Sequence, residues 1–197
     1  LAFNGASIMV AFADYDIDGD LDAYLVTYRI APRKNLQGRY IQKNGKPVMV
    51  EELREQFDLL AGPDQRFFEV VSGQYDHLYE NNGDGTFSDV SKRAFGESAG
   101  GNDPGNAAMW WDYNDDRLPD LYIANDFAGP DRLLQNNGDG TFNQVTRTCL
   151  PHTPWMSMGV DAADINNDGL IDFRGPDMSG TSHYKQKVSM GDMTQNG

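Results

Sequence analysis

The sequence predicts an all-β protein built from repeated antiparallel sheets, and three observations support this prediction. An acidic nonapeptide with the pattern Asp-x-Asp/Asn-x-Asp-x-x-x-Asp occurs three times, at residues 14–22, 112–120 and 164–172. The turn-forming segment Asn-Gly-Asp-Gly occurs twice, at residues 82–85 and 137–140. Short runs rich in aromatic and β-branched residues flank both kinds of segment, which is the pattern of strands joined by tight turns.

Each nonapeptide predicts a calcium-binding loop between two strands. Oxygen atoms at alternate positions of a tight loop suit Ca²⁺, a hard ion that takes about six to eight oxygen ligands. Positions 1, 3, 5 and 9 offer side-chain oxygens, and position 7 offers its backbone carbonyl. A single acidic segment could be only a turn, but three copies in one register favour about three calcium sites. The candidate ligands are Asp14, Asp16, Asp18, Asp20 and Asp22 in the first loop, Asp112, Asn114, Asp116, Leu118 and Asp120 in the second, and Asp164, Asn166, Asp168, Leu170 and Asp172 in the third.

The residues at positions 6 and 12 refine this prediction. Glycine at position 6 permits a sharp turn at positive φ. Gly19 and Gly169 meet this requirement and Arg117 does not, so the second loop is the weakest candidate. An EF-hand is excluded because it needs a bidentate Glu at position 12. The residues at that position are Leu25, Ile123 and Gly175.

Apolar segments around the loops predict a four-stranded unit. The strands expected before and after the loops are residues 9–13, 23–28, 108–111, 121–124 and 158–163. Further short strands flank each Asn-Gly-Asp-Gly hairpin, whose Asp84 and Asp139 are interpreted as turn caps rather than metal ligands. Strand, calcium loop, strand, connection, strand, hairpin and strand together make one blade of a β-propeller.

The repeats divide the chain into about three blades. Blade 1 spans residues 1–100 with an insertion at about residues 29–72, blade 2 spans residues 101–155, and a partial blade 3 spans residues 156–197. Propellers close with about four to eight blades. The chain is therefore expected to be part of a larger propeller, completed by more of the same chain or by neighbouring chains.

The insertion predicts one helix, over residues 48–60. Leu53, Phe57 and Leu60 would share one face of this helix, and Gly62-Pro63 would end it. A blade does not need such a helix, which could cap the rim, contact a neighbour or simply pack as an excursion.

Charge and cysteine content restrict the class of protein. The net charge is −14 and the isoelectric point is about 4.4, which excludes nucleic acid as a partner because phosphate binding needs clustered Lys and Arg. Loops of this kind with weak affinity would fill with calcium outside the cell but not in the cytosol. Cys149 is the only cysteine, so the chain has no internal disulfide. It is expected to be a small buried apolar residue, and the less favoured alternative is a thiol that forms an intermolecular bond.

The nonapeptides and the Asn-Asn-Gly-Asp-Gly-Thr-Phe hairpins resemble the FG-GAP/VCBS repeats of integrin-type β-propellers. The run from Trp110 to Phe142 resembles, more narrowly, the bacterial FG-GAP-like proteins related to cartilage acidic protein 1, which often carry an ASPIC/UnbV domain. The resemblance implies structural Ca²⁺ on one rim of a propeller in a secreted or surface protein. Arg117 departs from the pattern of the family.

These observations favour a calcium-stabilised extracellular or cell-surface module, in a bacterium secreted or periplasmic, that binds a protein or a glycan. No Gly-x-Ser-x-Gly, His-Glu-x-x-His or phosphate-loop motif points to catalysis, and no membrane-spanning segment occurs. Two alternatives stay open. Open sheet edges could make the chain a self-assembling structural subunit of a surface assembly or fibre, and a polysaccharide-acting enzyme is possible because fold does not fix function.

Overall fold

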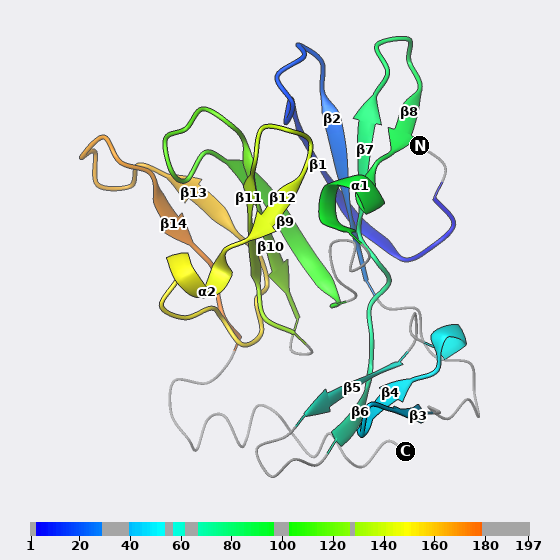
Figure 1. Cartoon of the computed structure of the whole chain (residues 1–197). Helices are drawn as coiled ribbons and strands as arrows, with labels where there is room; N and C mark the ends of the chain where they lie inside the picture. The colour runs from blue at the N-terminus through cyan, green and yellow to red at the C-terminus, as the bar shows by residue number, and fades with distance from the viewer. Residues whose placement is uncertain are drawn as a thin grey trace.

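The regular secondary structure of the described chain is mainly antiparallel β-sheet (Figure 1). Helices in this part of the chain are short: α1 at Ser91–Phe95, α2 at Thr146–Cys149 and the 3-10 helix η1 at Glu51–Leu53. The all-β prediction is confirmed. The computed structural model describes residues 3–28, 40–53, 57–61, 67–96, 103–126 and 129–178.

Two four-stranded sheets and one two-stranded sheet form the body of the described structure. The first sheet has the order β1-β2-β7-β8 and the second the order β9-β10-β11-β12, so each follows the predicted unit strand by strand. The closed propeller and its blade count stay predictions. The strands are β1 Ser7–Ala13, β2 Asp22–Thr27, β7 His77–Asn81 and β8 Phe87–Asp89 in the first sheet, β9 Gly105–Trp111, β10 Asp120–Asn125, β11 Arg132–Asn136 and β12 Phe142–Gln144 in the second, and β13 Asp161–Ala163 and β14 Asp172–Arg174 in the third.

The three sheets pack face to face, and strand β10 lies in the middle of this packing. Successive side chains of a strand point to opposite faces. Leu121 and Ile123 therefore join the apolar cluster against the first sheet, while Tyr122 and Ala124 join the cluster that contains Phe173 of the third sheet. Every residue of β10 is buried. A strand covered on both faces explains why the segment reads as a continuous apolar run rather than an alternating one.

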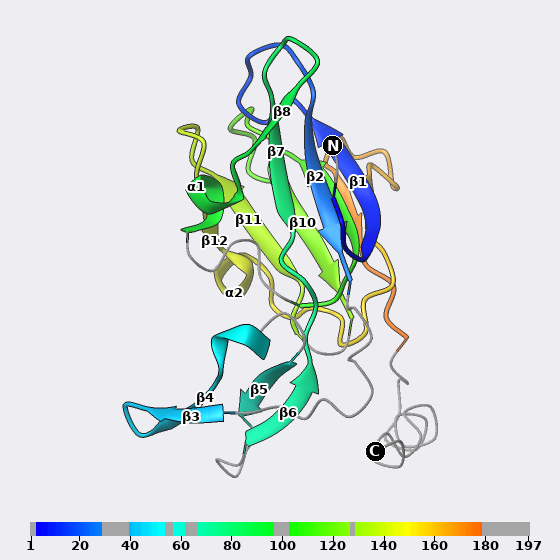
Figure 2. The same ribbon diagram turned by 90° about the vertical axis from the view of Figure 1, so that its right-hand side faces the viewer.

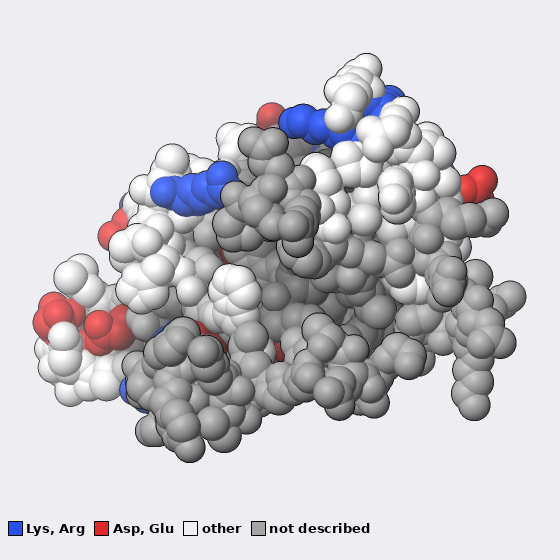
Figure 3. Space-filling model, turned by 90° about the horizontal axis from the view of Figure 1, so that it is seen from below, with Lys and Arg blue, Asp and Glu red and all other residues white. Residues whose placement is uncertain are grey.

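The nonapeptide loops lie at one end of the strands of the stacked sheets, and the insertion lies at the other end. Figures 1 and 2 place the β1–β2, β9–β10 and β13–β14 loops at the upper ends of their strands, and the hairpins β3–β4 and β5–β6 below the sheets. Both Lys/Arg and Asp/Glu side chains occur on the lower face of the described residues (Figure 3). The acidic loops therefore lie at one end of the stacked sheets, and a face of mixed charge lies at the opposite end.

The predicted helix in the insertion is wrong. Strand β4 at Lys46–Met49, the 3-10 turn and strand β5 at Phe57–Ala61 occupy its place, and β5 pairs with β6 at Phe67–Val71. Strand β3 at Tyr40–Lys43 pairs with β4. The apolar side chains of Met49, Leu53 and Phe57 do cluster, at helix-like spacing. Pairing with the β-prone segment 67–71 outweighs the local pattern, which is how tertiary contacts override propensity.

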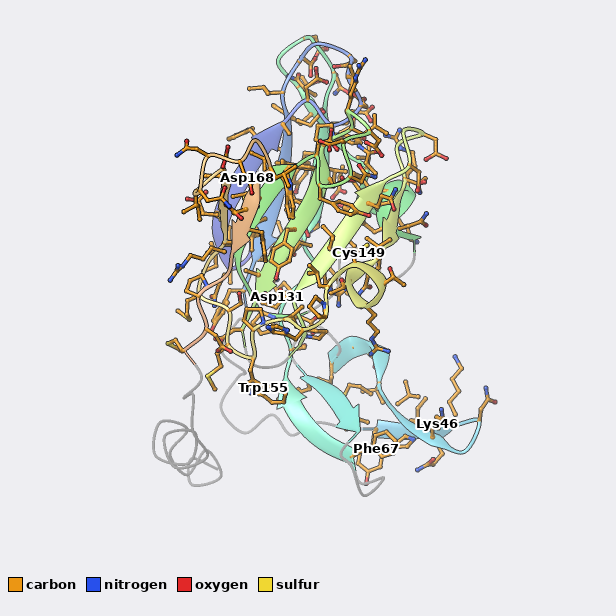
Figure 4. The ribbon with its side chains drawn as sticks, turned by 90° about the vertical axis from the view of Figure 1, so that its left-hand side faces the viewer. Lys46, Phe67, Asp131, Cys149, Trp155 and Asp168 are labelled. Carbon is orange, nitrogen blue, oxygen red and sulfur yellow. The ribbon has the colours of Figure 1, made fainter. Side chains whose placement is uncertain are left out.

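At the end away from the loops, each four-stranded sheet contains a buried carboxylate that accepts hydrogen bonds from its second strand. Asp76, directly before β7, accepts hydrogen bonds from the hydroxyl of Tyr24 (2.8 Å) and the backbone N–H of Thr27 (2.7 Å). Asp131, directly before β11, accepts from the hydroxyl of Tyr122 (2.6 Å) and from the last N–H of β10 (2.8 Å). Figure 4 shows Asp131 at the opposite end of the sheets from Asp168 of the third loop.

Candidate metal centre

The first nonapeptide is held in shape by its own carboxylates. Asp14, at position 1, accepts hydrogen bonds from the backbone N–H groups of Asp18 (3.0 Å) and Gly19 (3.1 Å). Asp18, at position 5, accepts from the N–H of Asp20 (3.1 Å). Asp22, at position 9, accepts from the N–H at position 2 (3.3 Å). The predicted metal ligands therefore also fix the backbone of the loop.

The second and third nonapeptides repeat this network. The position 1 carboxylate accepts from the N–H groups at positions 5 and 6, at 3.1 and 2.7 Å for Asp112 and at 3.1 and 2.9 Å for Asp164. Position 5 again accepts from position 7, at 2.9 Å in the second loop and 2.8 Å in the third. Position 9 accepts from position 2, at 3.2 and 3.0 Å. The three loops thus share one backbone design.

Two positions of every loop lie in the left-handed region of backbone conformation. Position 6 has φ of 99° at Gly19, 72° at Arg117 and 86° at Gly169. The second loop therefore keeps the turn with a non-glycine residue, a conformation that costs about 1 kcal/mol. Sequence reasoning missed position 4, where no glycine marks the turn. The residues there are Ile17 (φ 62°), Asp115 (φ 60°) and Asn167 (φ 59°).

Replacing Arg117 with glycine is expected to stabilise the chain by about 1 kcal/mol, because glycine adopts positive φ without a clash at Cβ. The midpoint of urea unfolding measures the change. Gly19→Ala is the matched control at the same position of the first loop and should destabilise the chain by a similar amount. Unchanged stability in Arg117→Gly would show that the second loop carries no strain at this residue.

Two of the three loops gather three carboxylates each, with one oxygen of each group within 4.8 Å of the other two. The loop that Arg117 made the weakest candidate is one of them. A cluster of like charges at this spacing is unfavourable unless a cation lies among them. The groups are Asp14, Asp16 and Asp18 in the first loop, and Asp112, Asp116 and Asp120 in the second.

The position 9 carboxylates are the most enclosed candidate ligands. Asp22 and Asp120 are fully buried, and each accepts a further hydrogen bond from the third strand of its sheet, from the N–H of Asn81 (2.9 Å) and of Asn136 (2.8 Å) respectively. Burial raises the pKa of Asp22 and of Asp120 to about 6. A bound cation would favour the ionised form and reverse this shift.

The third loop is less complete within the described residues. Asp172 is only half-buried, and the carboxylates of Asp164, Asp168 and Asp172 do not gather within the distance that the other two loops reach. The third sheet has only two strands in the described part of the chain, so no third strand anchors the position 9 carboxylate as Asn81 and Asn136 do.

The donor set of the first loop fits a hard cation. Its side chains offer only oxygen, which suits Ca²⁺ rather than zinc or copper. One oxygen of Asp20, at position 7, is buried and has no hydrogen-bond partner among the described residues. Such an atom is unfavourable unless something satisfies it. The prediction assigned position 7 only a backbone carbonyl, so the carboxylate of Asp20 is an additional candidate ligand.

Tyr15, at position 2 of the first loop, joins that loop to the second sheet. It is fully buried, and its ring stacks on Trp110 with centroids 6.1 Å apart. Its hydroxyl donates to Glu80 (3.0 Å) and accepts from Arg93 (3.1 Å). Its backbone carbonyl accepts from the side-chain amide of Asn136 (2.8 Å). Sequence reasoning missed this role, although an aromatic residue at position 2 recurs in the second loop as Tyr113.

The two Asn-Gly-Asp-Gly hairpins are capped as predicted. The carboxylate of Asp84 accepts from the N–H and the hydroxyl of Thr86 (2.9 and 2.6 Å), and Asp139 accepts in the same way from Thr141 (3.0 and 2.5 Å). These hydrogen bonds lower the pKa of both carboxyl groups. One oxygen of each carboxylate accepts both hydrogen bonds within the turn, in agreement with the interpretation as a turn cap.

The remaining single residues are not among the predicted metal ligands. Cys149 is exposed at the end of α2, so the expectation of a buried thiol is wrong; the helix is too short to cover it (Figure 4). Trp110 and Trp111 pack between sheets, whereas Trp155 is 63% exposed near the lower end of the second sheet. His77 pairs with Asp89 at 2.8 Å.

Comparison with known proteins agrees with the loop geometry. Within the described residues, none of the helices has the length and apolar character needed to span a membrane. A search of the curated proteins found no match. A family model described as an FG-GAP-like repeat matches residues 112–173, from the first residue of the second nonapeptide to just past the end of the third. This segment is therefore similar to FG-GAP-like repeats, and the narrower resemblance to proteins related to cartilage acidic protein 1 stays an expectation.

Proposed function

We propose that the chain forms blades of a calcium-stabilised β-propeller that acts as a non-catalytic binding or adhesion module outside the cell or at its surface. The main support for this proposal is that three loops with the same carboxylate network lie at the same end of stacked antiparallel sheets (Figure 2). Similarity to FG-GAP-like repeats supports it, because such repeats are typical of extracellular adhesion proteins.

Calcium would act here as a structural ion. In the first loop, Asp14, Asp16 and Asp18 would hold it, together with the buried carboxylate of Asp22. A cation at this place removes the repulsion among these groups and satisfies the free oxygen of Asp20. The bound ion stabilises the folded chain because the unfolded chain lacks the site. The opposite edge and the loops between blades remain available for a protein or glycan partner.

The direct test is calcium binding by equilibrium dialysis with the intact chain. We expect about three Ca²⁺ per chain in millimolar calcium, and one fewer in Asp168→Ala, which lacks the position 5 ligand of the third loop. Mg²⁺ at the same concentration should not compete well, because it requires a smaller, near-octahedral site. Binding that is absent at millimolar calcium, or that Asp168→Ala leaves unchanged, would contradict the proposal.

A structural subunit is a second candidate function, and exposed apolar side chains on the two outer sheets favour it. Ile8 and Phe12 of β1 are 51% and 56% exposed, and Ile165, Leu170 and Ile171 of the third loop are also exposed. The second sheet, covered on both sides, has no such large exposed apolar residue among its described strands. Sedimentation at micromolar concentration in calcium tests this candidate: self-association supports it, and a strict monomer contradicts it for this chain.

A further inference from the structure

Asn136 touches both of the first two loops at once. Its backbone N–H donates to Asp120, the position 9 carboxylate of the second loop (2.8 Å). Its side-chain amide donates to the carbonyl of Pro119 (3.1 Å) and, across the sheet interface, to the carbonyl of Tyr15 in the first loop (2.8 Å). All three contacts are buried or partly buried, and Asn136 itself is 2% exposed. A single residue therefore lies between the two candidate calcium sites.

The equivalent residue in the first sheet, Asn81, has two of these three contacts and lacks the one across the sheet interface. Asn81 donates its backbone N–H to Asp22 (2.9 Å) and its side-chain amide to the carbonyl of Leu21 (3.3 Å). These bonds correspond to those of Asn136 within its own sheet. Asn81 has no hydrogen bond to another nonapeptide among the described residues. The chain thus offers a natural control, in which the same asparagine anchors one loop without bridging two.

We infer that Asn136 couples the first two calcium sites, so that calcium in either loop strengthens calcium binding in the other. The inference rests on the proposed function and deepens it. Tyr15 lies between Asp14 and Asp16, and its N–H is already held by Asp22. The amide of Asn136 fixes the other side of the same residue, its carbonyl. Ordering Asp120 around an ion orders Asn136, which in turn holds Tyr15 and its neighbouring ligands in place.

The size of the coupling follows from the bond that carries it. A single hydrogen bond between neutral groups changes an equilibrium by roughly two- to tenfold, and we expect the affinity of each loop to rise by a factor in this range when the other is filled. Thermodynamic linkage requires the same factor in both directions. Tyr15 stacks on Trp110, so the tryptophan fluorescence of the folded chain should change when calcium fills the first loop. This signal is a second readout, independent of the heat measured by calorimetry.

The experiment is a binding cycle measured by isothermal titration calorimetry. All variants carry Asp168→Ala, which removes the third loop. With Asp18→Ala added, only the second loop can still bind calcium. With Asp116→Ala added, only the first loop can. The product of these two single-site association constants, compared with the overall constant of the two-site protein, gives the coupling factor. The cycle is repeated with Asn136→Ala and with the matched control Asn81→Ala.

We expect a coupling factor above one in the parent cycle and in Asn81→Ala, and a factor of one in Asn136→Ala. Two sites that bind independently in the parent, or coupling that persists in Asn136→Ala, would overturn the inference while leaving the calcium proposal intact. Loops that bind no calcium would instead refute the proposed function. If Asn136→Ala lowers the folded fraction in chelator, Asn136→Ser, whose side chain is too short to reach Tyr15, serves in its place.

Discussion

Calcium at about 10 mM is expected to raise the thermal unfolding midpoint by roughly 5–10 °C for each filled loop. Sites of the extracellular type have dissociation constants near 10⁻⁴ M, so this concentration is about a hundredfold excess and stabilises by about 2.7 kcal/mol per site. In a chain of this size, 1 kcal/mol shifts the midpoint by about 2–4 °C. The rise should appear in Ca²⁺, and much less in matched Mg²⁺ or in chelator.

The position 5 variants make this expectation specific to each loop. Asp116→Ala and Asp168→Ala should each remove one loop's share of the calcium-dependent rise. In chelator they should change the midpoint little, because the lost side chains are exposed and accept only local hydrogen bonds, from the backbone at position 7 and the side-chain amide at position 3 of the same loop. An equal loss with and without calcium would mean that these carboxylates serve only the turn, and the structural role of the ion would have to be abandoned.

The sheets could be predicted from the sequence because turn chemistry marks their strand boundaries. Gly83 and Gly85 take positive φ in the first hairpin, and the loops at 14–22 and 112–120 join neighbouring antiparallel strands, as predicted. The insertion was mispredicted because its apolar residues recur at the spacing of a helix, although a turn sequence within it indicates a hairpin. Asn44-Gly45, with φ of 54° and 75°, joins β3 to β4 and is a typical two-residue hairpin turn.

The loop segments of the candidate site were predictable from the sequence, but their surroundings were not, and the assignment of calcium ligands stays a prediction. Alternating oxygen residues identify positions 1, 3, 5 and 9 within a contiguous segment. The inter-sheet contacts of Tyr15 and Asn136 join residues 121 positions apart, and no local pattern specifies which turn meets which. The burial of Asp22 and Asp120 likewise depends on a third strand that is distant in sequence, in the first sheet beyond the whole insertion.

Asp76 is expected to make the stability of the chain fall as pH rises from about 4 to about 7 in the absence of calcium. Burial raises the pKa of Asp76 to about 7, above its unfolded value near 3.9, despite the hydrogen bonds it accepts from Tyr24 and Thr27. The folded chain therefore binds this proton more tightly than the unfolded chain. Its contribution is fully present below the unfolded pKa and is lost as pH passes through the folded pKa.

The variant Asp76→Asn distinguishes the contribution of Asp76 to the pH dependence of stability from the contributions of the other carboxylates. The amide has nearly the shape of the protonated acid and carries no charge at any pH, so the variant should lose the part of the pH dependence that Asp76 supplies. Urea unfolding in chelator, from pH 4.5 to 8, measures the difference between the two proteins. It should favour the variant increasingly as pH rises, with a limiting slope of about 1.4 kcal/mol per pH unit between the two pKa values. Buried Asp22 and Asp120 remain in both proteins and cancel in the comparison. A difference that does not change with pH would show that Asp76 keeps its charge in the folded chain, stabilised by the three hydrogen bonds that it accepts.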